Sequence, residues 1–145
     1  MLNYLLILHL LGAAIWTGGH LILALVVLPK VLSSRNLDAL LQFEGQFEKI
    51  GMPALVIQII TGLWMAYKIL PNIGMWFAFD NDISVLIGMK LSLLLLTALV
   101  AMHARFWVIP RLSANNLNGF AINIILVTLF SVAFIVVGTL FRSGF

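Results

Sequence analysis

Residues that commonly bind metals lie inside long apolar stretches of this chain. The chain has three histidines; His9 and His20 lie in the first apolar stretch, and His103 shares the third stretch with Lys90. Polar side chains are costly inside a lipid bilayer and usually serve a function there. Imidazole nitrogens bind transition metals and haem iron. These residues therefore indicate a metal or haem site within a membrane.

Spacing places the first two histidines on one face of a helix. His9 and His20 are 11 residues apart, which is three helical turns plus about 20°, and roughly 16 Å along the axis. Trp16 belongs to the same stripe, with Gly12 and Gly19 beside it. Small residues next to a histidine leave room either for a flat ligand or for a closely packed helix.

Depth within the spans suggests how the ligands pair. His20 and His103 lie at similar depth, and His9 and Lys90 lie together nearer the other side. Two parallel helices would then carry facing nitrogen ligands at two levels, as in transmembrane b-type cytochromes. We predict a low-spin haem b held between His20 and His103, and a second haem at His9, completed by Lys90, a methionine or a partner subunit.

Two simpler interpretations of the same residues remain open. An intramembrane histidine can serve only as a hydrogen-bonding group between helices. Lys90 can extend its amine toward the lipid headgroups without binding anything.

Composition and hydropathy define the elements that must position these residues. Hydrophobic residues make up 63% of the 145 residues, charged residues make up 9%, and the mean hydropathy is +1.14. An ordinary soluble domain is about 25% charged. Four apolar stretches, at about 3–28, 50–70, 83–109 and 117–141, each reach the roughly 20 residues that cross a bilayer as a helix. We predict an all-α integral membrane protein whose single domain is a four-transmembrane-helix bundle.

Two further features refine this predicted bundle. The prolines Pro29, Pro71 and Pro110 are expected to end the first three spans. Residues 36–49 interleave apolar and charged side chains, which predicts a short interfacial helix after the first span.

Basic residues are distributed unequally between the two ends of the predicted bundle. One side of the bundle carries five flanking basic residues, Lys30, Arg35, Lys49, Arg105 and Arg111, whereas the other carries two, Lys68 and Arg142. Because basic loops prefer the cytoplasm, we expect a multi-pass protein of the inner membrane with both termini in the periplasm. Scattered basic residues beside the spans also explain the net charge of +3 without a nucleic-acid partner.

Several chemistries are excluded by what the sequence lacks. It has no cysteine, and therefore no thiolate site or disulfide. The motifs H-E-x-x-H and G-x-G-x-x-G are absent. All five acidic residues lie outside the expected spans, which argues against a carboxylate-based proton pump.

Three stretches resemble a known family. The segments HLLGAAIWTGGHLILALVVLP (9–29), GMPALVIQIITGLWM (51–65) and KLSLLLLTALVAMH (90–103) resemble the first three spans of the copper-resistance D (CopD) family and of the related HemJ-type protoporphyrinogen oxidases. The HemJ resemblance implies haem b at His9, a role for Lys90 and a redox reaction with quinone as a possible acceptor. The CopD resemblance implies copper handling.

Departures from the HemJ pattern bear on the choice between these activities. HemJ proteins begin their last span with Asn-Glu-x-Pro, whereas Asn123 is followed here by Ile124. His20 is an extra histidine relative to that pattern.

Together these observations favour a haem b protein that transfers electrons within the membrane. Its expected partners are the lipid bilayer, further copies of the chain, and quinone or another redox protein. The alternatives are a porphyrinogen oxidase, a copper transport or resistance protein, and a structural membrane subunit.

Overall fold

The computed structural model describes residues 2–143, and side chains from 3 to 141. Its α-helices are α1 (Leu2–Ile22), α2 (Leu28–Ser34), α3 (Leu37–Ile69), α4 (Asp82–His103) and α5 (Leu117–Ser143). Four candidate membrane spans result, Asn3–Ser34, Leu37–Ile69, Asp82–Arg111 and Leu117–Phe141. Residues 2–143 contain no β-strand. The predicted all-α protein with four spans is confirmed.

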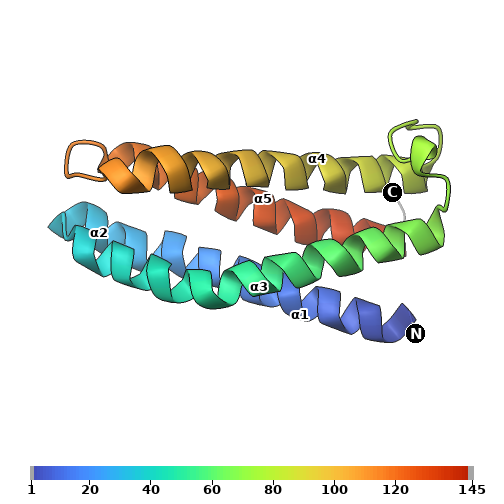
Figure 1. Cartoon of the computed structure of the whole chain (residues 1–145), viewed down its shortest axis with the longest axis horizontal. Coiled ribbons are helices and arrows are strands. Elements are labelled where there is room, and N and C mark those ends of the chain that lie inside the picture. Colours follow the sequence, from blue (N-terminus) through green and yellow to red (C-terminus); the bar gives the residue numbers. More distant parts are fainter. Residues whose placement is uncertain (1, 144–145) are drawn as a thin grey trace.

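The helices form an elongated bundle (Figure 1). α1 packs along α3 and also against α5, whereas the main neighbour of α4 is α5. The loop between α4 and α5 lies at the same end of the bundle as α2, and the 70–81 segment lies at the opposite end with both ends of the described chain (Figure 1). α1 and α4, which carry the histidines, are therefore not packed along one another.

Glycines allow α1 to approach α3 closely. A Cβ atom at Gly12 would lie 2.8 Å from the carbonyl oxygen of Ala54, and one at Gly19 would overlap the ring of Phe47. A side chain at Gly12 would therefore have to displace the backbone of α3, and one at Gly19 would have to displace the Phe47 ring. Of the two uses left open by the sequence, the structure assigns these glycines to close helix packing.

The first span does not end at Pro29, contrary to the prediction. A five-residue π-helix, Leu23–Val27, joins α1 to α2, and Pro29 lies in the first turn of α2. Proline is tolerated in the first turn of an α-helix, and the π-helix directly before it interrupts the α-helical hydrogen-bond pattern. The span instead runs to Ser34 and is capped by Arg35, whose φ of 55° lies in the left-handed region.

The other two prolines lie at the ends of their spans, as predicted. Pro110 follows a second π-helix, Ala104–Val108, and occupies a 3-10 turn, Ile109–Arg111. Pro71 follows Leu70, the residue that caps α3. Sequence alone does not distinguish these prolines from Pro29.

The segment 36–49 is not a separate interfacial helix; this part of the prediction is wrong. α3 runs unbroken from Leu37, with the Asn36 side chain accepting a hydrogen bond from the Ala39 backbone N–H. Leu40 is fully buried, and the Phe47 ring lies beside Trp16 and His20. Because the bundle buries these apolar residues, the segment folds as the first half of α3.

The main apolar core lies at the α2 end of the bundle, which we call the basic end. Its buried members are Leu23, Leu28, Val31, Leu40, Leu117, Phe120, Ala121 and Ile124. The Arg35 guanidinium donates a hydrogen bond to the carbonyl oxygen of Ala114, 3.3 Å away, and so joins the two loops at this end. The loops expected to share one side of the membrane therefore lie at the same end. The side chain of Arg142 lies outside the described ones.

The other end of the bundle, which we call the terminal end, holds the 70–81 segment. The indole N–H of Trp76 donates to the Leu70 carbonyl oxygen at 2.9 Å. α4 then begins with a capping box, in which the Asn81 and Ser84 side chains each bond the other's backbone N–H. These local bonds fix where the third span starts.

Candidate functional site

His9 is held between α1 and α3. Its Nδ1 lies 2.9 Å from the carbonyl oxygen of Gln58 and 3.1 Å from Oγ1 of Thr61. The Thr61 hydroxyl itself donates to the Ile57 carbonyl oxygen at 2.6 Å, so Thr61 accepts from His9. Nδ1 therefore carries the proton, and Nε2 keeps its lone pair. Gly62 leaves room for the ring, since a Cβ there would lie 2.9 Å from His9 Cε1.

His20 is the most buried of the three histidines. Its Nδ1 donates to the Trp16 carbonyl oxygen, one turn back on α1, at 2.9 Å. The ring centroid lies 4.4 Å from that of Trp16 and 5.2 Å from that of Phe47. Trp16, predicted as a cofactor-binding residue, is itself buried against His20. The two aromatic side chains occupy the space around this imidazole.

His103 lies at the end of α4 and faces α5. Its Nδ1 lies 3.2 Å from Oδ1 of Asn123. The Asn123 amide is oriented by a second bond, from its Nδ2 to the Gly119 carbonyl oxygen at 3.0 Å. The ring also stacks on Trp107 and is otherwise exposed.

The three histidines thus share one arrangement. In each, Nδ1 faces an oxygen acceptor, so the neutral ring carries its proton on Nδ1. Histidines that bind metals are typically held in this way, with one ring N–H bonded to an oxygen and the other nitrogen free for the metal. Each neutral imidazole therefore keeps the lone pair of Nε2, although at His20 the rings of Trp16 and Phe47 lie around it.

The structure does not bring His20 and His103 together. The Thr128 hydroxyl donates to the His20 backbone carbonyl at 3.3 Å, whereas His103 contacts Asn123. Those two α5 residues are separated by five positions, about 7.5 Å along the helix and roughly 140° around it. The His20 imidazole itself lies against Trp16 and against Phe47 of α3, whereas the His103 imidazole lies against Asn123 of α5. The two rings therefore face different helices in this packing.

Lys90, which was predicted to share a level with His9, packs against α5. Its amine lies 5.3 Å from the centre of the Phe141 ring, and a Cβ atom at Gly138 would be 3.4 Å from it. The lysine is thus directed toward α5, whereas the His9 ring contacts α3.

Sequence reasoning overlooked two amides that matter at this site. Gln58 supplies the carbonyl that holds His9, and its side chain is buried. Asn123 was noted only as a departure from a family motif, yet it orients His103. Both could have been found by asking which strongly polar side chains lie in the middle of an apolar span.

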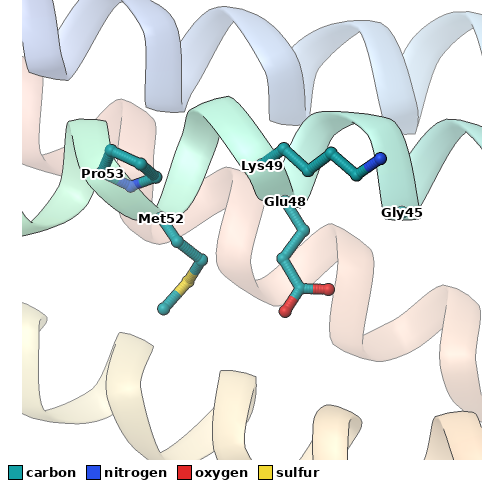
Figure 2. A pocket seen from close by; sticks show the side chains of 5 residues that line it. All are labelled: Gly45, Glu48, Lys49, Met52 and Pro53. Atoms are coloured by element: carbon teal, nitrogen blue, oxygen red, sulfur yellow. The ribbon is translucent and has the colours of Figure 1, made fainter.

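A groove lies on the face of α3 that looks toward α4. Its volume is about 360 Å³, and it is lined by Gly45, Glu48, Lys49, Met52 and Pro53. Glu48 and Met52 point toward α4 (Figure 2). Glu48 forms an ion pair with Arg105 at 3.2 Å.

The Glu48–Arg105 ion pair shows which residues of α3 and of the π-helix after α4 lie at the same height. One turn further along α3 lies Met52, and about one turn back from Arg105 lies Met102. The two thioethers therefore occupy similar depth, and both methionines are about half exposed. Thioether sulfur is a soft ligand that suits Cu(I).

Ligands of the commonest kinds are not clustered. Within residues 2–143, no group of three or more His, Cys, Asp or Glu side chains could hold one metal ion. A metal bound to any one of these histidines would therefore need other donors.

Comparison with known proteins identifies the family. The family described as "Copper resistance protein D" (CopD) matches residues 41–141, a segment that includes Lys90 and His103 but begins after His9 and His20. No curated protein and no solved structure matches the chain. The family match covers well over half of the sequence and agrees with the resemblance of the second and third spans. The chain belongs to the CopD family of copper resistance proteins.

Proposed function

We propose that this membrane protein binds copper ions within the bilayer through Nε2 of His9, His20 and His103. The observation that carries the proposal is the shared arrangement of the three imidazoles, each with Nδ1 bonded to an oxygen acceptor. Imidazole is a good copper ligand, and membership of the CopD family favours copper as the ion.

The depths of the three histidines suggest a transport role. Contacts place His20 opposite Thr128 and His103 near Asn123, while His9 lies about 16 Å from His20 toward the terminal end. Copper would meet His9 or His103 first, because both are more exposed than His20. His20 would then serve as a buried intermediate ligand.

Further ligands are needed at each level. Near the basic end, Met52 and Met102 could supply thioethers to Cu(I). At His9, the missing donors would be water or groups from a second copy of the chain, which is why a homo-oligomer belongs to this proposal.

Copper titration of the purified protein in lipid nanodiscs tests the proposal. We expect saturable Cu(I) binding, measured by competition with a chromogenic chelator, and loss of that binding in a variant with all three histidines replaced by alanine. Met75→Leu serves as a control, because Met75 lies in the 70–81 segment away from the histidines. Equal binding by the wild type and the triple variant would overturn the proposal.

Haem b at His9 is the second candidate function. The observation that favours it is the half-buried imidazole of His9, whose Nδ1 is bonded to Gln58 and whose Nε2 keeps its lone pair. Membrane electron transfer, with quinone or a redox protein as partner, would follow from this candidate. A Soret band in the protein as purified, lost in His9→Ala, together with no copper binding, would favour haem over copper.

The orientation in the membrane is part of the proposal. The loops at the basic end carry Lys30, Arg35 and Arg111, and basic loops prefer the cytoplasm. We therefore propose an inner-membrane protein with both termini periplasmic. A reporter that works only in the cytoplasm should be inactive when fused to the C-terminus, and activity there would reverse the orientation.

A further inference from the structure

Two buried polar atoms have no hydrogen-bond partner among the described side chains. They are Nε1 of Trp16 and Oε1 of Gln58. Trp16 is 6% exposed and Gln58 is 8% exposed. One atom is a donor and the other an acceptor, and lipid tails can satisfy neither of them.

These two residues lie between the first two histidines. His9 donates to the backbone carbonyl of Gln58, and His20 donates to the backbone carbonyl of Trp16. The residues that hold the two imidazoles in place are therefore the same residues whose side chains carry the unpartnered atoms.

The packing of α1 against α3 determines the distance between the backbones of Trp16 and Gln58. A Cβ atom at Gly12 would lie 3.3 Å from Cβ of Gln58, so Gly12 is level with Gln58. Trp16 follows Gly12 by one turn of α1, about 6 Å along the axis. The donor and the acceptor do not bond each other directly, so a small molecule that both accepts and donates hydrogen bonds would satisfy the two atoms together.

We infer that water is bound between Trp16 and Gln58 in the interior of the bundle, accepting from the indole N–H and donating to the amide oxygen. Water is the smallest molecule with both capacities, and buried waters typically satisfy polar groups of this kind. The bound water links the supports of His9 and His20 into one polar strip through an apolar bundle. This inference does not depend on copper binding.

Water-edited NMR of the full chain in lipid nanodiscs tests the inference. The probe is magnetisation transfer from water to the indole N–H of Trp16, whose signal is assigned by its loss in Trp16→Phe. We expect clear transfer in the wild type. Gln58→Leu should reduce that transfer at least tenfold, because water loses its acceptor and its space.

A matched control makes the same substitution elsewhere on α3. Gln42 is exposed on the same helix, so Gln42→Leu should leave the transfer to Trp16 unchanged. If Gln58→Leu does not fold, the wild-type spectrum still decides. A Trp16 indole N–H without transfer from water would overturn the inference, whether it proved unbonded or directly bonded to Gln58. Transfer that persists in a folded Gln58→Leu variant would overturn it as well.

Discussion

His9 and His20 lie on one stripe of the same helix, but their surroundings differ. His20 lies beside the apolar core of the basic end, with aromatic rings of Trp16 and Phe47 around it. His9 lies nearer the terminal end, half buried, beside Gln58 and Thr61. The two histidines thus point in the same direction from α1, but other side chains enclose His20 whereas His9 can be approached.

The difference shows that the neighbouring helix decides what an intramembrane histidine can do. α3 presents an aromatic ring to His20, but a carbonyl, a hydroxyl and a glycine to His9. His20 therefore contributes more to packing than His9 does. His9 is the more accessible ligand, because less side-chain volume surrounds its ring.

The close contact between α1 and α3 underlies both environments, so breaking it should have the largest effect. Gly12→Val places side-chain atoms against the Ala54 carbonyl, which cannot move without shifting α3. We expect a loss of about 3 kcal/mol in the free energy of unfolding, measured by denaturation in mixed detergent. Gly18→Ala is the control, because nothing lies within 4 Å of a Cβ there. Similar stability of the two variants would contradict the tight contact.

Removing each histidine in turn compares the two environments directly. His20→Ala leaves a cavity between two aromatic rings and should lower the free energy of unfolding by about 2 kcal/mol. His9→Ala loses hydrogen bonds but little enclosed volume, so about 1 kcal/mol is expected. The same denaturation assay measures both values. An equal or larger loss for His9→Ala would show that the enclosure of His20 has been overstated.

Substituting the residues that hydrogen-bond to the histidine rings tests how much each bond contributes to copper affinity. Asn123→Leu removes the only acceptor at Nδ1 of His103 seen among the described residues, so we expect about a tenfold loss of affinity. Thr61→Val should matter less, because the Gln58 backbone still holds His9. Chelator competition gives both affinities. The account predicts this order, and the reverse order would contradict it.

The smallest expected effect concerns the ion pair that faces the groove. Glu48 and Arg105 are both partly exposed, and an exposed ion pair contributes about 0.5 kcal/mol. Glu48→Gln should therefore change the free energy of unfolding by no more than about that amount, and less as salt is raised. A loss of several times this size, insensitive to salt, would show that the pair holds α3 against α4.

The four spans could be predicted from the sequence because each is a long run of apolar residues, and hydropathy depends on composition alone. The end of the first span could not, because a π-helix at Leu23–Val27 carries the chain past Pro29. The interfacial helix was misjudged for a similar reason. An amphipathic pattern at 36–49 does not reveal whether lipid or a neighbouring helix covers its apolar side.

The sequence singles out the candidate residues but does not show how they pair. A histidine inside an apolar span stands out in the sequence, and all three were selected as candidates in this way. Pairing His20 with His103 required the first and third spans to be neighbours, whereas α1 packs against α3 and α5. Which helices touch depends on details such as Gly12 meeting Ala54, and these are visible only in three dimensions.

Copper binding by single histidine variants tests the central claim most directly. Cu(I) affinity would be measured in nanodiscs by chelator competition for the wild type, His9→Ala, His20→Ala and His103→Ala, with Gly18→Ala as a folded control. The account predicts that His9→Ala, His20→Ala and His103→Ala each weaken or remove a copper site, while the control binds as the wild type does. Unchanged copper affinity and stoichiometry in all three histidine variants would contradict the claim that these imidazoles are copper ligands.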